Sequence, residues 1–400
     1  MVKRNKISSA WIIRLFEKIT IRGVFLTFFG IGTGACAFII YQNIQGLNCN
    51  NRPLIGSYYY PWYTIQRWKY DRNVTGMPYL GPYDNSNISV INQHIDWAKQ
   101  AGIDYFIYSW LGTNKKEHGP ETKITDNFIR QTSEINYKIM PLYETPLALN
   151  QSPDNIDFDQ KYWPRLTAGD QFIKDMLAFS NQAHNSEHFL RINNCPRVAI
   201  YLARNMLNQA KYFNKLKKTL SNRNQCLDFT ADVSFWNSSD QPLARSKQSS
   251  EDQWAWLANN FSAVFGYNLY SHDINVYKIK GDLAFDKIFL KAKSVNQKKW
   301  EKRSHDVGLK YHYSIQPGYD DRLLRGNDRP AAPPSEKFLL KDWQRIDASL
   351  SKNDHILITS FNEWYEGTAL EPSKKNGSSL ISANRKATNS IKNKFCNWWQ

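Results

Sequence analysis

The sequence has few cysteines and no close grouping of metal-binding side chains. Only five of the 400 residues are cysteine, and no CxxC, HExxH or other close Cys/His spacing occurs. Structural zinc sites are built from such closely spaced thiolates and imidazoles. The pattern therefore gives no indication of zinc, and we expect neither a metal nor another cofactor. Internal repeats and low-complexity tracts are also missing, so nothing divides the bulk of the chain into smaller units.

Acidic residues are scarce relative to basic ones, 36 against 52, which gives a net charge of +16. The excess does not form one patch: residues 1–22 hold six basic residues and one acid, and the rest is spread widely. No sequence motif of a nucleic-acid-binding fold accompanies the charge, so we expect no nucleic-acid partner. Solvated helix faces account for most of it, with attraction to anionic glycans or lipid head groups as the alternative.

Charge is absent from residues 23–41, GVFLTFFGIGTGACAFIIY. Nineteen uncharged residues approach the ~20 that a helix needs to cross a bilayer. Because the basic flank precedes this run, the positive-inside rule places the N-terminus in the cytoplasm. We therefore expect a single-pass type II membrane protein with a cytoplasmic tail (1–22), a transmembrane anchor (23–41), a linker (42–52) and an extracytoplasmic folded domain (53–400). A cleaved signal peptide is the alternative, although the stretch before the apolar run is long for one.

The four cysteines outside the apolar run form an even set in a domain expected outside the cytosol, which favours disulfides. Cys49 and Cys396 flank the folded domain, whereas Cys195 and Cys226 bracket one strand–helix unit. Of the three possible pairings we favour Cys49–Cys396 with Cys195–Cys226. Free buried thiols are the alternative.

Strand-like and helix-like segments alternate through the folded domain. Apolar or aromatic runs typical of buried strands lie at 54–60, 103–110, 137–143, 198–201, 228–236, 262–269, 309–315 and 356–361. Helix-like sequence follows each of these eight runs, so the natural closure is a single (β/α)8 barrel of the TIM type. The long loop at 145–169 could cover part of the barrel face that carries the strand ends.

Aromatic and polar residues recur where the predicted strands end. They include Tyr60, Trp62, Ser109, Trp110, Glu144, Trp236, Tyr267, Tyr319, Glu363 and Glu366. In a parallel barrel these ends share one face, which is where catalytic residues lie. Two carboxylates three residues apart among aromatic rings suit glycoside chemistry, which needs one acid protonated and another ionised. Taken alone, the pair could equally be a surface loop with two solvated glutamates, and each aromatic could be core.

Five motifs, in this order, resemble the endo-α-mannosidases of glycoside hydrolase family 99 and their unclassified relatives. They are YYYPWY at 58–63, SW at 109–110, YE at 143–144, PGYDD at 317–321 followed by Arg325, and SFNEWYEGT at 360–368. Together they span nearly all of residues 53–398. The resemblance implies a (β/α)8 barrel and retaining, endo-acting hydrolysis of an α-mannosidic linkage in an N-glycan or mannan, with no metal doing the chemistry.

The resemblance also implies different roles for the two glutamates. Glu363 would act as base on the 2-hydroxyl of the sugar, which closes onto C1 to give a 1,2-anhydro intermediate. Glu366 would act as acid on the leaving oxygen and then as base on water. Such an acid needs a raised pKa while its neighbour stays ionised. The expected substrate contacts are Tyr60, Trp62, Trp110, Glu144, Tyr267, Tyr319, Arg325 and Asn362.

One residue departs from the family pattern. Tyr365 stands where the animal Golgi member of the family has histidine, which bears on the substrate more than on the reaction. Two other functions remain open: a catalytically idle glycan-binding protein, and an enzyme that assembles or remodels another α-linked cell-surface polysaccharide. The presence of both glutamates argues against the first, because binding alone needs no matched acid and base.

Overall fold

The computed structural model describes residues 52–71, 73–163, 165–233, 249–267, 282–326 and 331–396. The expected cytoplasmic tail, the anchor and all but the last residue of the linker lie outside this part of the chain. Among the helices that are described, none combines the length and the apolar character needed to cross a bilayer. The membrane anchor at 23–41 therefore stays a prediction.

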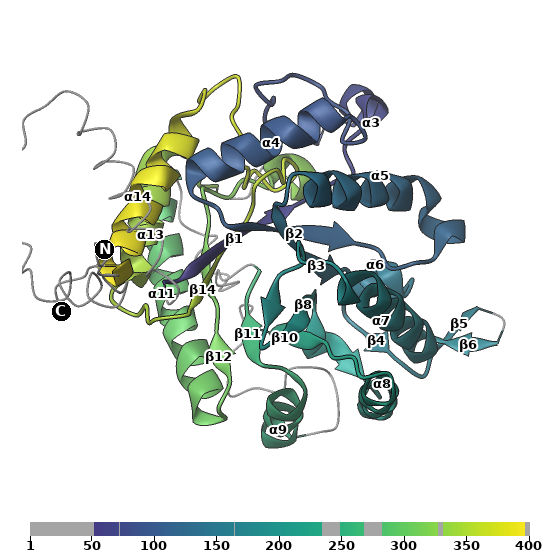
Figure 1. Cartoon of the computed structure of the whole chain (residues 1–400). Helices are drawn as coiled ribbons and strands as arrows, with labels where there is room; N and C mark the ends of the chain where they lie inside the picture. Colours follow the sequence, from purple (N-terminus) through teal and green to yellow (C-terminus); the bar gives the residue numbers. More distant parts are fainter. Residues whose placement is uncertain are drawn as a thin grey trace, which may run out of the picture. The chain divides into compact units, whose positions relative to one another are not determined.

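Nine parallel strands of the described chain form a nearly closed barrel (Figure 1). Their order around it is β12-β11-β10-β8-β3-β2-β1-β14-β13. In chain order they are β1 Leu54–Tyr59, β2 Tyr105–Trp110, β3 Lys138–Tyr143, β8 Cys195–Ile200, β10 Asp228–Asp232, β11 Ala263–Phe265, β12 Lys310–Tyr311, β13 Tyr313–Ile315 and β14 His355–Ile358.

The strand expected at 309–315 is split in two at His312. Its first piece, β12, pairs with β11, and its second piece, β13, pairs with β14. The two pieces thus share one position in the barrel and connect its two ends. Nine strands therefore occupy eight positions, which is consistent with the expected (β/α)8 barrel.

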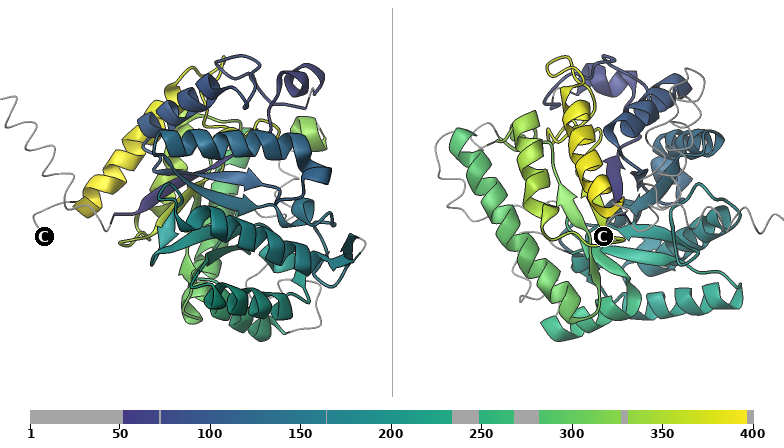
Figure 2. Two further views of the ribbon diagram at one scale, coloured as in Figure 1. Left: turned by 45° about the vertical axis from the view of Figure 1, so that its right-hand side comes forward. Right: turned by 60° about the vertical axis from the view of Figure 1, so that its left-hand side comes forward.

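Helices surround the strands, as the two further views in Figure 2 show. The long ones are α4 Ile88–Ala101, α5 Lys115–Glu134, α7 Ala168–His184, α8 Ala210–Asn222, α9 Ser250–Asn260, α11 Asp282–Asp306, α13 Glu336–Asp347 and α14 Ser379–Cys396. The helix α4 illustrates the sequence logic: Ile91, Ile95 and Ala98 are buried at helical spacing. Its end is set by Gly102, which adopts the left-handed conformation (φ 80°) typical of helix C-termini.

Alternation along each strand sorts side chains between two cores. In β1, Ile55 and Tyr59 belong to the main cluster that packs against the helices, whereas Tyr58 belongs to a second cluster. Leu142 of β3 and Phe265 of β11 belong to the second cluster too, so this cluster fills the barrel interior. Because the period is two, the residues just beyond these strands continue the same alternation. Parity along a strand therefore predicts which strand-end side chains can reach a pocket above the interior.

Short elements occupy the connections. They are α3 Ile65–Tyr70, α6 Thr145–Ala148, β4 Ile156–Asp157, β5 Lys161–Trp163, β6 Leu166–Thr167, β7 Arg191–Ile192, the 3-10 turn Ala203–Asn205, β9 Met206–Leu207 and α12 Arg322–Arg325. The loop expected at 145–169 thus has structure of its own. Its β5–β6 hairpin projects away from the barrel beside α7 (Figure 1).

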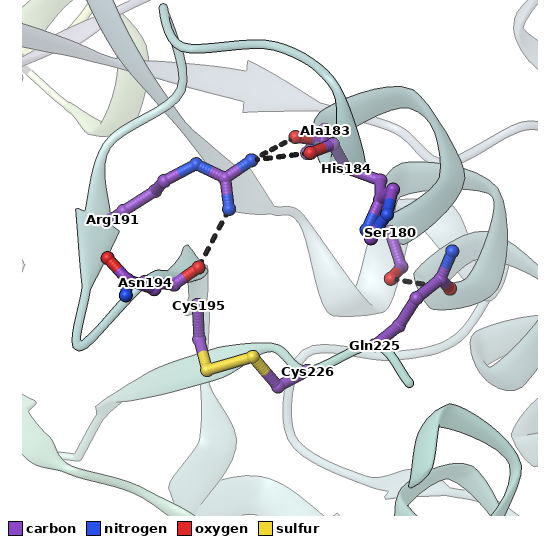
Figure 3. Close-up of a disulfide and its surroundings, with 8 residues drawn as sticks. All are labelled: Ser180, Ala183, His184, Arg191, Asn194, Cys195, Gln225 and Cys226. Atoms are coloured by element: carbon purple, nitrogen blue, oxygen red, sulfur yellow. Dashed lines mark hydrogen bonds between the residues drawn. A yellow bond between two sulfur atoms is a disulfide. The ribbon is translucent and has the colours of Figure 1, made fainter. Parts of the chain in front are cut away.

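The expected pairing of Cys195 with Cys226 is confirmed, with an S–S distance of 2.09 Å (Figure 3). The bond ties the first residue of β8 to the chain just before β10, at the amino ends of these strands. Close by, Arg191 donates hydrogen bonds to the carbonyl oxygens of Asn194 and His184, at 2.8 and 3.1 Å. Cys396 is also disulfide-bonded. Its expected partner Cys49 lies outside the described residues, so that pairing stays a prediction.

Candidate active site

A pocket of about 320 Å³ opens at the carboxyl ends of the barrel strands. Its lining residues come from strand ends or from the segments directly after them. They are Tyr60, Trp62, Leu142, Glu144, Leu147, Tyr201, Tyr267, Leu324, Glu363, Tyr365 and Glu366. The pocket thus brings three carboxylates together among aromatic rings, at the face where barrel enzymes bind their substrates. Among the described side chains of the long 145–169 loop, Leu147 is the one that contributes to the lining.

Glu363 is held by its own turn. Its backbone N–H donates to the hydroxyl of Ser360 at 2.7 Å, and its carboxylate accepts the backbone N–H of Tyr365 at 2.8 Å. The residue is only 5% exposed. Burial raises the pKa of the Glu363 carboxyl to about 8; the charge of Glu366 adds to the rise, and the Tyr365 N–H opposes it.

Glu366 sits in a different environment, because a cation holds it. The guanidinium of Arg325, at the end of α12, donates from Nη2 to Oε1 of Glu366 at 2.9 Å. The backbone also links the two segments, since the N–H of Asp320 donates to the carbonyl oxygen of Glu366 at 2.8 Å. Gly367 completes the turn with φ 57°, and a Cβ there would lie 2.8 Å from the Asp320 carbonyl oxygen. Glycine is therefore required for the two segments to meet.

The raised pKa belongs to Glu363, the residue to which the family resemblance gives the base role. The resemblance alone implies a raised pKa for the acid and an ionised neighbour. Burial explains why the pKa of Glu363 is raised, because its carboxyl group is enclosed beside two other carboxylates. The carboxylate of Glu366, in contrast, faces Arg325. In the unliganded protein the protonated form of Glu363 is therefore favoured at neutral pH.

Glu144 supplies the third carboxylate of the pocket. It directly follows β3 at the inward parity of Leu142 and is 6% exposed. Burial raises the pKa of Glu144 to about 7; the charges of Asp232 and Glu366 add to the rise, and the Ser109 hydroxyl opposes it. At neutral pH both the protonated form of Glu144, which can donate a hydrogen bond, and its ionised form, which accepts them, are populated. Both forms can bind sugar hydroxyls.

Two tyrosines and a tryptophan line the wall near Glu363. The hydroxyl of Tyr60 donates to that of Tyr267 at 2.6 Å, across the barrel interior. The ring centroids of Trp62 and Tyr60 lie 4.6 Å apart. The guanidinium carbon of Arg67 lies over the Trp62 ring, 5.9 Å from its centroid. Rings of this kind provide flat apolar surfaces beside polar hydroxyls, which is the combination that sugar rings require.

Four expected substrate contacts are not among the lining residues, and one of them, Arg325, instead contacts the lining residue Glu366. Asn362 is fully buried behind the pocket, where its amide forms two hydrogen bonds with the backbone of Tyr60, at 2.8 and 3.0 Å. Trp110 points to the outer core and packs against Tyr143 and Phe179. Tyr319 packs on Phe289, and its hydroxyl accepts a hydrogen bond from Arg325, which contacts Glu366.

Asp232 and Tyr201 are functional candidates that the sequence analysis missed. Asp232 is 1% exposed and accepts the backbone N–H groups of Tyr267 and Leu202, at 3.1 and 3.2 Å. It therefore holds the Tyr267 backbone in place. Its charge also adds to the rise in the pKa of Glu144. The expected strand at 228–236 ends at Asp232, and Trp236 lies outside the described residues. Phe229 and Ala231 of this strand belong to the outer core, so alternation places Asp232 on the inward side. This alternation is the signal that could have identified Asp232.

A buried network holds the turn between the two glutamates. The indole N–H of Trp364 donates to Glu371 at 2.9 Å, and the backbone N–H of Trp364 donates to the hydroxyl of Tyr63 at 3.1 Å. Glu371 also accepts the hydroxyl of Tyr83 at 2.9 Å and lies 3.2 Å from Nε2 of His94 on α4. Because the side chains of Glu371 and His94 are fully buried, this network makes the turn a rigid part of the barrel.

A family model described as glycosyltransferase WbsX matches residues 75–384. The chain belongs to this family. A comparison with curated proteins found no significant match.

The fold is similar to that of solved glycoside hydrolase structures. A glycoside hydrolase-like protein is 19% identical with a TM-score of 0.65, over 86% of this chain and 95% of the other. The family 99 endo-α-mannosidase from Bacteroides thetaiotaomicron, in complex with bis-tris-propane, is 16% identical with a TM-score of 0.59, over 84% and 97%. A second structure of an endo-α-mannosidase of this family from the same organism has a TM-score of 0.58 at 14% identity, over 84% and 97%. The resemblance to family 99 is thus confirmed at the level of the fold.

Proposed function

We propose that this protein is a retaining, endo-acting glycoside hydrolase that cleaves α-mannosidic linkages inside a glycan. The observation that carries the proposal is the pairing of two glutamates in contrasting environments within one pocket. Glu363 is buried among rings and carboxylates, and Glu366 is bound by Arg325. Two carboxyl groups in unlike surroundings are what a reaction with one acid and one base requires.

The chain's own residues would carry out the reaction in two steps. Glu363 removes the proton of the 2-hydroxyl, whose oxygen forms a bond to C1 as the bond from C1 to the leaving oxygen breaks. Glu366 gives that oxygen a proton. The resulting 1,2-anhydro sugar is opened by water, which loses a proton to Glu366 while Glu363 returns its proton to O2. Two inversions at C1 give net retention.

The electrostatics of the site constrain this proposal. With a pKa of about 8, only about a tenth of Glu363 is ionised at pH 7. The ionised fraction is a stronger base than an ordinary carboxylate, which suits a hydroxyl as the proton source. The reaction would therefore draw on a minor form of the unliganded protein at neutral pH.

The dimensions of the pocket fit an endo-acting enzyme. Its volume of about 320 Å³ lies at the lower end of the ~300–1,000 Å³ typical of small-molecule sites. Such a space encloses a short section of a glycan and leaves the remainder outside. Exposed Leu147 and Leu324, both on short helices of the rim, would border the part that extends outward.

A second candidate function is glycosyl transfer, which the description of the matched family favours. The same intermediate would be formed, and a sugar hydroxyl would replace water as the group that opens it. The chain would then assemble or remodel an α-linked glycan. Product analysis with and without added acceptor sugars distinguishes the two.

Location outside the cytosol forms part of the proposal. The uncharged segment 23–41 with its basic N-terminal flank supports a membrane anchor. The Cys195–Cys226 disulfide supports an oxidising compartment for the barrel. A glycan substrate at the cell surface or in a secretory lumen would fit both.

The decisive experiment is a screen of the purified protein against α-mannosides of increasing length. We expect internal cleavage with the α-configuration retained, lost in the Glu363→Gln variant. Transfer to an added sugar in place of hydrolysis would favour the second candidate. Glycan binding without any turnover would instead indicate an idle binding protein.

A further inference from the structure

A buried carboxylate next to the pocket has no part in the proposed chemistry. Asp321 directly follows Asp320 and is fully buried. One of its oxygens, Oδ2, accepts the hydroxyl of Tyr319 at 2.8 Å and Nη1 of Arg325 at 2.8 Å. The same Nη1 also donates to the Tyr319 hydroxyl at 3.0 Å. Asp321, Tyr319 and Arg325 thus form a closed triangle of hydrogen bonds.

Arg325 extends from this triangle to the site. Its Nη1 group is engaged by Asp321 and Tyr319, and its Nη2 group contacts Oε1 of Glu366 at 2.9 Å. The side chain is 42% exposed and lies on a helix of only four residues. A long side chain in such a position loses considerable rotamer freedom when it is fixed, so something must hold it. The buried carboxylate of Asp321 provides that hold.

We propose that Asp321 is a positioning residue that sets how Arg325 meets Glu366. An arginine facing a single carboxylate tends to form a bidentate pair that occupies both carboxylate oxygens. By engaging Nη1, Asp321 restricts the contact to Nη2 and one oxygen of Glu366. Holding Arg325 in this way fixes the position of the Glu366 carboxyl group, which must give a proton to the leaving oxygen. This inference rests on the proposed acid role of Glu366.

The competing explanation is that Asp321 only stabilises the fold, because removing any buried ion pair costs stability. The neighbouring Asp320 provides a matched control. Its carboxylate pairs with Arg322, at 2.8 and 2.7 Å, on the same turn. Only its backbone N–H contacts Glu366, and an asparagine keeps that group.

The test compares Asp321→Asn with Asp320→Asn on two substrates that share one glycon. One has a sugar as leaving group, and the other has an activated aryl group that needs little protonation. We expect Asp321→Asn to lower kcat at least ~10-fold for the sugar leaving group and to leave the aryl substrate within about threefold. The KM values should change little, and Asp320→Asn should resemble the wild type on both substrates.

A second variant covers the case in which Asp321→Asn fails to fold. Arg325→Lys keeps the charge, but a single ammonium cannot bridge Asp321 and Glu366 in the manner of a planar guanidinium. It should show the same dependence on the leaving group. Equal losses on both substrates, or no loss on either, would overturn the inference. The Glu366→Gln variant distinguishes a failure of the positioning role of Asp321 from a failure of the acid role of Glu366. If Glu366→Gln shows no leaving-group dependence, the proposed acid role itself is wrong.

Discussion

The guanidinium of Arg325 contacts the carboxylate of Glu366 at 2.9 Å, which joins the segment after β13 to the turn after β14. Three residues before Glu366, Glu363 is buried and contacts the backbone of its own turn. The same residue type thus faces a cation at one position and is buried with a raised pKa at the other. This contrast, set by neighbouring segments, is the basis of the predictions on catalysis.

The pH dependence of kcat/KM should report on Glu363. A carboxyl with a pKa of about 8 is protonated below that pH, so a base in this position loses its active form as pH falls. If Glu363 is the base, kcat/KM should rise about tenfold from pH 6 to 7 and about fivefold from pH 7 to 8. Initial rates in a constant-ionic-strength buffer series measure this. A fall in kcat/KM through the same range would make Glu363 the acid and reverse the two roles.

The Glu363→Gln variant should be more stable than the wild type. Because the folded-state pKa of about 8 exceeds the ordinary value of 4.5, the folded state binds the extra proton and loses stability as pH rises from about 4.5 to 8. Glutamine removes this penalty, which is on the order of 3 kcal/mol at pH 7. In urea unfolding, the free energy of unfolding of Glu363→Gln should exceed that of the wild type mainly at pH 8 and much less at pH 5. The matched Glu366→Gln variant removes an ion-paired carboxylate and should show no such gain.

The buried pair Lys293–Asp342 should be essential for stability. Asp342 accepts Lys293 Nζ and Arg345 Nε, each at 2.6 Å, and the backbone N–H of Gln316 at 2.9 Å. Both members of the pair are fully buried, and burial already lowers the pKa of Lys293 to about 8. Asp342→Asn leaves buried cations without their counter-charge and should cost about 3–5 kcal/mol in urea unfolding.

The exposed pair Lys302–Asp306 provides the control for this measurement. Its two side chains are 78% and 46% exposed, and solvent screens their interaction. Asp306→Asn should therefore leave the unfolding midpoint nearly unchanged. Equal effects at both sites would show that the burial of Asp342 does not determine its contribution. Because Gln316 begins the segment that leads to Asp321 and Arg325, Asp342→Asn should also lower activity in the protein that remains folded.

The barrel could be predicted from the sequence because the strand signal is local. Residues 54–60 and 103–110 are rich in apolar and aromatic side chains, and each is a strand of the barrel within a few residues. The split at His312 could not be predicted, because it follows from which neighbour each half of the strand pairs with. Strand pairing is a long-range property, and a seven-residue pattern does not contain it.

The site was predicted in part, for a similar reason. Glu144 and Tyr267 continue the inward alternation of their strands and line the pocket, whereas Trp110 falls on the outward parity. Asn362 lies next to Glu363, yet its amide is directed to the Tyr60 backbone. A motif gives the residue types that recur at a site. Only the tertiary contacts separate those that face the pocket from those that support it.

The orientation in the membrane is the next prediction. If residues 23–41 are a type II anchor, the barrel should remain with the membrane fraction after an alkaline wash and should be digested by protease added outside intact spheroplasts or cells. A soluble barrel released outside the cell would indicate a cleaved signal peptide. A barrel protected from external protease but digested after lysis would contradict the orientation.

The chemistry itself can be tested by separating the two glutamates, because they act on different atoms. Glu363→Gln should abolish turnover of every substrate, since no base remains for the 2-hydroxyl. Glu366→Gln should lower kcat by ~10²–10⁴-fold when the leaving group is a sugar, and far less when it is an activated aryl group. Rates on matched pairs of substrates measure this difference.

The strongest test of the neighbouring-group route is a substrate that lacks the 2-hydroxyl. Without this hydroxyl, no internal nucleophile can form the bond to C1, so the intact enzyme should not turn over the 2-deoxy compound. Calorimetry should still detect binding of the 2-deoxy compound, because the other contacts of the pocket remain. Cleavage at the normal rate would show that the 2-hydroxyl does not take part. Glu363 would then have to attack C1 directly, as the nucleophile does in ordinary retaining glycosidases.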